Sequence, residues 1–102
     1  SPAHAIRKAL AKAGIDQSDV ASWEINEAFA SVTVAAIKAL GLDEDTVNVN
    51  GSGCSLGHPI GCTCARMIVT MMNELERTDS RYGVVAMCAA GGMGSATVIE
   101  RV

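Results

Sequence analysis

Three short segments of the chain combine residues that can move protons or stabilise a developing negative charge. They are residues 26–29 (NEAF), 57–59 (GHP) and 88–94 (CAAGGMG). Histidine and an activated thiol act as acid–base groups near neutral pH, and a glycine loop exposes the backbone N–H groups that an oxyanion needs. These residue types therefore indicate proton transfer beside a stabilised oxyanion.

Each segment also has a purely structural interpretation. Asn26 is a good helix N-cap, and Glu27 in the first helical turn would complement the helix dipole. An isolated histidine such as His58 commonly satisfies buried carbonyls, and Cys88 at the end of a buried strand fits an inert thiol. A functional His58 is favoured by its glycine-rich loop, where a substrate can approach the backbone closely. On the residues taken singly, both interpretations stay open.

Four cysteines, at positions 54, 62, 64 and 88, raise the questions of disulfides and of zinc. No secretory signal precedes them, and Cys88 lies far from the others in sequence, so we expect reduced thiols in a cytosol-like compartment. Cys54, Cys62, Cys64 and His58 are all zinc-ligand types, but their spacing contains no Cys-x-x-Cys pair. We therefore expect no bound metal, with zinc as the alternative.

The composition limits the chain to one domain and excludes some classes of partner. It has 102 residues, 49% of them apolar, and eight basic against eleven acidic residues give a net charge of −3. The charges are scattered, so no basic face for nucleic acid is expected. No apolar run reaches the roughly 18 residues that span a membrane. We expect a cytoplasmic protein, or one of an organellar matrix if a targeting signal lies upstream.

The apolar pattern predicts an α/β layer fold in which helices and strands alternate. Strands are expected at residues 20–25, 47–49, 82–88 and 95–102. Helices are expected at residues 3–13, 27–40 and 62–77. Two glycine-rich stretches, residues 50–61 and 89–94, are expected to be irregular loops. Because the second loop is short, the last two strands should form an antiparallel pair at one edge.

Taken together, the three segments resemble the thiolase family in their order and spacing. The C-terminal domain of that family carries Asn-Glu-Ala-Phe, then Gly-His-Pro, then Cys-x-Gly-Gly-Gly-x-Gly. Residues 47–51 (VNVNG) and 82–85 (YGVV) resemble the family too, and the likeness covers essentially the whole chain. It implies a thiolase-like layered α/β fold, with residues 1–102 forming a C-terminal half-domain whose mixed sheet is packed with helices.

The resemblance also implies an activity: acyl transfer between acyl-CoA and acetyl-CoA or CoA, by Claisen condensation or by thiolysis of 3-ketoacyl-CoA. In thiolases a nucleophilic cysteine of the N-terminal domain takes the acyl group. His58 would activate that cysteine and share an oxyanion hole with a water held by Asn26. Cys88 would move the second proton. Coenzyme A thioesters would be the substrates of this lipid-metabolising enzyme, and no cofactor is implied.

Further residues enter the site by the same resemblance. A second oxyanion hole would combine the backbone N–H of the nucleophile with that of Ala90, two residues beyond Cys88, and the backbone of Gly91 would belong to the same loop. Gly57, Pro59 and Phe29 would belong to the loops that meet the substrate. Three residues depart from the family, since Ala90, Ser52 and Cys64 occupy positions where glycine is usual.

The largest departure is that the chain contains no segment resembling the one that carries the nucleophile. We expect a partial C-terminal domain that needs the N-terminal thiolase domain in cis or in trans, is inactive alone, and forms a homo-oligomer when complete. The alternative is a non-catalytic thiolase-like domain that binds lipid, acyl-CoA or a partner protein. A ketoacyl synthase is disfavoured, because enzymes of that group have a Cys-His-His site and lack a cysteine base like Cys88.

Overall fold

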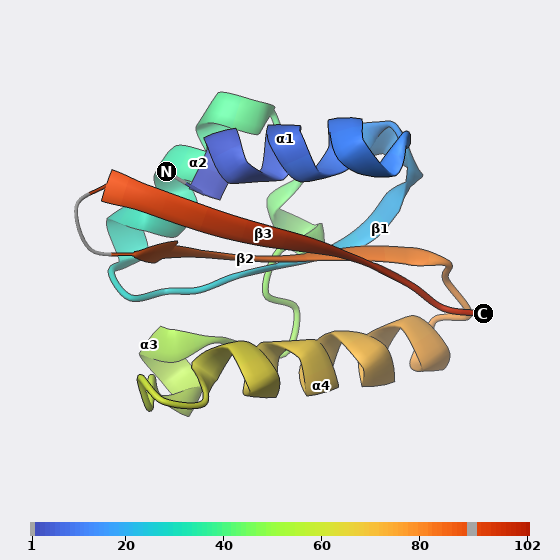
Figure 1. The fold of residues 1–102 in the computed structure, drawn as a ribbon. Helices are drawn as coiled ribbons and strands as arrows, with labels where there is room; N and C mark the ends of the chain where they lie inside the picture. Colours follow the sequence, from blue (N-terminus) through green and yellow to red (C-terminus); the bar gives the residue numbers. More distant parts are fainter. Residues whose placement is uncertain (1, 90–91) are drawn as a thin grey trace.

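Three strands form one mixed sheet with helices on both faces (Figure 1). The structure is a computed structural model, and it describes residues 2–89 and 92–102. The strands are β1 (Val20–Ile25), β2 (Tyr82–Ala89) and β3 (Met93–Glu100), in that order across the sheet. β1 runs parallel to β2, and β2 runs antiparallel to β3. The predicted α/β fold and its antiparallel last pair are confirmed.

The helices divide between the two faces of the sheet. α1 (Pro2–Ala13) and α2 (Ala30–Leu40) cover one face, and the single turn α3 (Gly53–Leu56) and α4 (Thr63–Arg77) cover the other (Figure 1). Parallel strands need a crossover connection, and here the chain from β1 to β2 passes through α2, α3 and α4. Single turns of 3₁₀ helix occur at Gln17–Asp19 and Glu44–Thr46.

The larger core lies between the sheet and the pair α1 and α2. Ile6 and Leu10, one turn apart on α1, pack with Trp23 and Ile25 of β1. These positions follow the spacing of four in a helix and the alternation of two in a strand. By the same alternation, the intervening Glu24 faces the opposite side of the sheet, where α4 lies.

The smaller core lies between the sheet and α4. Met67, Met71 and Leu75 of α4 pack against Val85 of β2. Gly83 of β2 also faces this helix, and a Cβ atom at that position would lie 2.2 Å from Sδ of Met71. The lack of a side chain at Gly83 is therefore what lets α4 approach the sheet so closely.

The helix predicted from residue 27 begins later. α2 starts at Ala30, with Phe29 in the N-cap position and in extended conformation (φ −138°, ψ 140°). Residues 26–29 are therefore a connection after β1 and not a first helical turn. The N-cap role of Asn26 and the helix-dipole role of Glu27 were wrong predictions, since both residues precede the cap.

The strand predicted at residues 47–49 does not form. Val47 makes an isolated parallel bridge with Trp23, and Asn48 has a left-handed φ of +50°. The Nδ2 of Asn48 donates to Ile25 O at 2.8 Å, and Ile25 N donates to Oδ1 of Asn48 at 2.8 Å. A side-chain amide thus supplies the hydrogen bonds that a neighbouring strand would have given to the end of β1.

Both predicted loops are more regular than expected. The stretch 50–61 contains α3, and the stretch 89–94 is shortened because β2 extends to Ala89 and β3 begins at Met93. Residues 90 and 91, between these strands, lie outside the described residues.

Candidate active site

The three segments singled out in the sequence follow elements that end at the same edge of the sheet. The connection after β1, the region of α3 and the start of α4, and the end of β2 lie at one end of the molecule (Figure 1). This is the carboxyl end of the parallel strands β1 and β2, which is where open α/β sheets usually bind their ligands.

Asn26 directly follows β1, and its side chain is buried. Its backbone N–H donates to Ala86 O of β2 at 2.9 Å, which extends the sheet pairing by one residue. Only 1% of Asn26 is exposed, and neither Oδ1 nor Nδ2 has a hydrogen-bond partner among the described residues. A buried unpaired polar group costs about 1–3 kcal/mol. Burial of this amide therefore costs folding free energy, and its two polar atoms form no hydrogen bond with the rest of the described chain.

The short helix α3 packs against residues 26 and 27 as closely as the atoms allow. A Cβ atom at Gly53 would lie 2.8 Å from Glu27 O and 3.3 Å from Oδ1 of Asn26. Cys54 N donates to Oε1 of Glu27 at 3.2 Å. Glu27 therefore holds the first residues of α3, and α3 forms the wall beside the Asn26 amide.

His58 lies between α3 and α4, and it is half-buried. Its Nδ1 is 2.7 Å from Oγ1 of Thr63, the fully buried first residue of α4. Oγ1 of Thr63 also donates to Pro59 O at 2.9 Å. Because a hydroxyl has one proton to donate, we assign Nδ1 of His58 as the donor in the shared contact, which leaves Nε2 with its lone pair. The ring of His58 is thereby oriented by a hydroxyl and not by a buried carbonyl.

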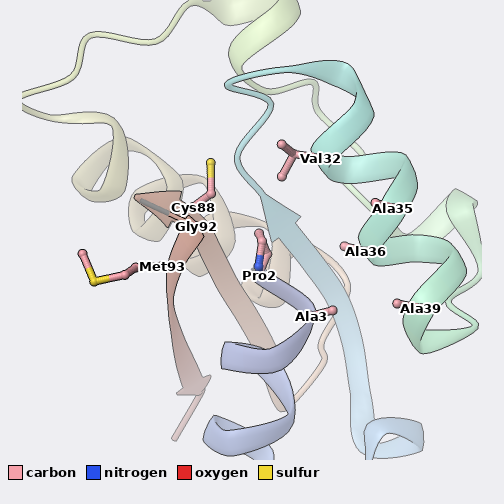
Figure 2. A pocket seen from close by; sticks show the side chains of 9 residues that line it. All are labelled: Pro2, Ala3, Val32, Ala35, Ala36, Ala39, Cys88, Gly92 and Met93. Atoms are coloured by element: carbon pink, nitrogen blue, oxygen red, sulfur yellow. The ribbon is translucent and has the colours of Figure 1, made fainter. Parts of the chain in front are cut away.

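Cys88 is the penultimate residue of β2 and is half-buried. It pairs with Gly94 of β3, and alternation with Ala86 places it on the face of α1 and α2. Figure 2 shows it with Pro2 of α1 and Val32 of α2, and these residues line an apolar hollow whose volume is about 360 Å³. The thiol therefore reaches a hollow and not the packed core.

The sheet separates Asn26 from Cys88, although they lie at the ends of neighbouring strands. Asn26 is on the face of α3 and α4, and Cys88 is on the face of α1 and α2. The structure brings Asn26 against α3 and brings His58 against Thr63. It stays a prediction that Asn26, His58 and Cys88 act on one substrate. Such a substrate would have to bind at the edge of the sheet, where the two faces meet.

The loop residues predicted to meet the substrate are described in part. Ala90 and Gly91 lie outside the described residues. Gly57 has a φ of +100°, a conformation that a side chain would strain, and it leads directly into the histidine. Phe29 is 71% exposed, and Pro59 O accepts hydrogen bonds from the start of α4. Contact between a substrate and Gly57, Pro59 or Phe29 stays a prediction.

The cysteines do not form a metal site within residues 2–89 and 92–102. All four are free thiols, with Cys54, Cys62 and Cys64 exposed. In this part of the chain no group of three or more His, Cys, Asp or Glu side chains is placed to hold a metal ion, so the zinc set with His58 is not assembled. None of the described helices combines the length and apolar character needed to traverse a bilayer.

A buried ion pair lies next to the candidate site. Nη1 of Arg66 is 3.1 Å from Oε1 of Glu24, and Glu24 is 1% exposed. Burial raises the pKa of Glu24 to about 7, opposed by the charge and hydrogen bond of Arg66. Sequence reasoning gave no role in the site to Glu24, Arg66 or Thr63. Their signals were weak: a charged residue inside an apolar strand, an arginine in a first helical turn, and a hydroxyl five positions after the histidine.

Comparison with known proteins decides the family. Residues 1–101 match the family model described as "Thiolase, C-terminal domain". The chain belongs to the thiolase family. This thiolase chain is 52% identical over 100 residues to the peroxisomal 3-ketoacyl-CoA thiolase B of Mus musculus, a match that covers 97% of the chain and 24% of the relative. It is 46% identical over 99 residues to the 3-ketoacyl-CoA thiolase of Bacillus subtilis, covering 97% of the chain and 25% of the relative.

A solved thiolase structure has the same fold. The crystal structure of the Bacillus anthracis acetyl-CoA acetyltransferase superposes with a TM-score of 0.95 at 50% sequence identity, covering 99% of this chain and 26% of that one. The predicted thiolase-like layered α/β fold is confirmed, and the chain belongs to a family of enzymes. It spans about a quarter of the length of the thiolases that it matches.

Proposed function

We propose that this chain is the C-terminal catalytic portion of a thiolase that transfers acyl groups between acyl-CoA and acetyl-CoA or CoA. It would act with an N-terminal thiolase domain, in cis or in trans, that provides the nucleophilic cysteine. The complete enzyme would be a homo-oligomer of the cytoplasm or of an organellar matrix, and it would need no cofactor beyond its coenzyme A thioester substrates.

The observation that carries this proposal is the buried amide of Asn26. It lies at the carboxyl end of β1 with both polar atoms unpartnered among the described residues. A side chain that only packs would not need an amide there, and an apolar residue would avoid the desolvation cost. An amide held in a fixed direction can bind a water or an oxygen that gains negative charge, which is the requirement of an oxyanion hole.

His58 has the geometry for the first proton transfer. With Nδ1 donating to Thr63, Nε2 can take the proton of the nucleophilic thiol. The thiolate then attacks the thioester carbonyl carbon, the carbon–sulfur bond to CoA breaks, and the CoA thiolate leaves with the proton from Nε2. Asn26, through a bound water, and His58 stabilise the carbonyl oxygen while it is negative.

Cys88 would move the second proton. As a thiolate it removes a proton from the methyl carbon of acetyl-CoA. The carbanion attacks the carbonyl carbon of the acyl-enzyme, a carbon–carbon bond forms, and the thioester bond to the nucleophilic cysteine breaks and releases that cysteine as a thiolate. In the reverse direction Cys88 returns the proton to the acetyl-CoA carbanion, and His58 takes the proton of incoming CoA. Its place at the end of β2, half-buried and beside an apolar hollow, supports this role, because a base must be able to reach its substrate.

The test is Cys88→Ser in the full-length enzyme. The fold should persist, because the change in volume is small, and turnover should fall by ~10²–10⁴-fold, the usual effect of losing a positioned acid–base group. Acylation should suffer less, since that step depends on His58. The expected signature is therefore an acyl-enzyme that discharges slowly, measured as a mass increase on the N-terminal part.

Cys62→Ser is the matched control, because Cys62 is an exposed thiol at the start of α4. It should leave turnover nearly unchanged. If both variants behave alike, or if Cys88→Ser turns over at a near-normal rate, Cys88 is a structural thiol. A domain that only binds lipid, acyl-CoA or a protein would give that result.

A further inference from the structure

Arg66 joins three parts of the candidate site through its guanidinium group. Its Nη1 donates to Oε1 of Glu24 in β1 at 3.1 Å and lies 3.4 Å from Oγ1 of Thr70 in α4. Its Nη2 donates to Oγ of Ser52, just before α3, at 3.1 Å. An arginine presents its donors in a rigid planar fork, so these contacts fix the relative positions of β1, α3 and α4.

The elements joined by Arg66 are those that carry the two oxyanion donors. Glu24 lies two residues before Asn26 on the same face of β1. Ser52 is fully buried and directly precedes Gly53, which contacts Asn26. On α4, Arg66 lies three residues after Thr63, which holds the histidine.

The ion pair between Glu24 and Arg66 contributes little to the stability of the fold. Glu24 is almost fully buried, while the side chain of Arg66 is 24% exposed. Removing a carboxylate from water costs more than a single partner usually returns, and the raised pKa of Glu24 shows that Arg66 does not fully offset that cost. The negative charges of Glu27 and Glu74 act against the ionised form as well.

From these contacts we propose that Glu24 and Arg66 are positioning residues of the thiolase reaction, which hold the Asn26 amide and the His58 imidazole at the separation that one thioester oxygen requires. This inference rests on the proposed function. Ser52 completes the link, because its hydroxyl gives Arg66 an acceptor at a position where a glycine would offer none. The departure from glycine at this position thereby has a structural use.

The experiment uses the full-length enzyme with Glu24→Gln. Glutamine keeps the volume and an acceptor for Arg66 but removes the charge that fixes the guanidinium. We expect kcat to fall by ~10–100-fold, the size of effect seen when a supporting partner of a site residue is lost. KM for acyl-CoA should change little. The acidic limb of the kcat profile should become shallower, because protonation of Glu24 as the pH falls through about 7 contributes to it only in the wild type.

Two further variants separate positioning from folding. Arg66→Lys keeps the charge but loses the planar fork, and it should lower kcat in the same way. Glu74→Gln removes the ion pair between Glu74 and Arg77 in α4, and it should not lower kcat, because the charge that it removes opposes the ionised form of Glu24.

The inference is overturned if kcat falls only in step with Tm, or if Glu74→Gln lowers kcat as much as Glu24→Gln does. It is also overturned if Glu24→Gln retains full activity with an unchanged pH profile. A wild-type enzyme without acyl transfer would refute the proposed function itself, which distinguishes that failure from the failure of the positioning role.

Discussion

At the scale of single residues, the direction of the His58 ring depends on one hydroxyl. We expect Thr63→Val to lower kcat/KM of the full-length enzyme by ~10–100-fold, because Nδ1 loses its acceptor and the imidazole is no longer held in one tautomer. Valine has nearly the same shape, so the buried site should not collapse. The measurement is kcat/KM of the variant and the wild type, with Tm of each protein to confirm that the fold persists.

Thr63→Ser is the matched control for that variant. Serine keeps the hydroxyl and should restore most of the activity. If Thr63→Val and Thr63→Ser give the same kcat/KM, the 2.7 Å contact between Thr63 and His58 has no part in the reaction.

The candidate residues were predictable from sequence to different degrees. The segments around Asn26, His58 and Cys88 could be found because their residue types and order are specific. Thr63 could not, because a hydroxyl five positions after a histidine has no meaning until a turn brings the two together. The capping role of Asn26 failed for a related reason: a local preference cannot show that the helix begins four residues later, at Ala30.

At the scale of elements, the side-chain amide of Asn48 hydrogen-bonds to the end of β1 in place of a neighbouring strand. We expect Asn48→Ala to lower the free energy of unfolding by ~2–4 kcal/mol, because two hydrogen bonds to Ile25 are lost and its backbone groups are left unpaired. The positive φ of Asn48 adds to the cost for alanine. Urea unfolding followed by circular dichroism measures the change.

Asn48→Gly separates the two contributions. Glycine adopts the left-handed φ without strain but cannot bond to Ile25, so it should be less destabilising than alanine by ~1 kcal/mol. Equal stability of all three proteins would mean that the amide does not support the end of β1.

Regular elements were predictable where the pattern was long. The helix over 62–77 and the strand over 82–88 matched α4 and β2 to within a residue at each end, because an amphipathic stripe or an apolar run fills each of them. The strand over 47–49 failed because β propensity at Val47 and Val49 does not reveal the side-chain bonds of Asn48. Those bonds join residues 23 positions apart in the chain.

At the scale of the whole molecule, the charge of Glu24 should make stability depend on pH. The folded state raises its pKa from 4.5 to about 7, so between these values the folded chain binds more protons than the unfolded chain. Stability then falls as the pH rises through that window. We expect Glu24→Gln to remove this decline, measured as Tm between pH 5 and pH 8, with the wild type losing more Tm than the variant.

Glu74 provides the contrasting case. The hydrogen bond from Arg77 lowers the pKa of Glu74. The contribution of Glu74 to stability is therefore present at pH values above the ordinary pKa of a glutamate, and it is lost on acidification. Glu74→Gln should therefore weaken the fold at neutral pH, and it should reduce the decline between pH 5 and pH 8 only slightly, because Glu74 is the smallest of the causes that raise the pKa of Glu24. A wild-type protein whose Tm is flat over this range would show that Glu24 stays ionised without cost.

The close approach of Met71 to Gly83 also constrains the order in which these two residues can be substituted. The two positions share one volume, since the first atom of any side chain at 83 would overlap the sulfur of Met71. A side chain at 83 therefore needs either a shorter residue at 71 or a shift of the flexible Met71 side chain. The reverse order passes through an overpacked and less stable intermediate. We therefore expect substitution at 71 before 83 to be tolerated better than the reverse order, and a library that varies either position alone would miss pairs that fold.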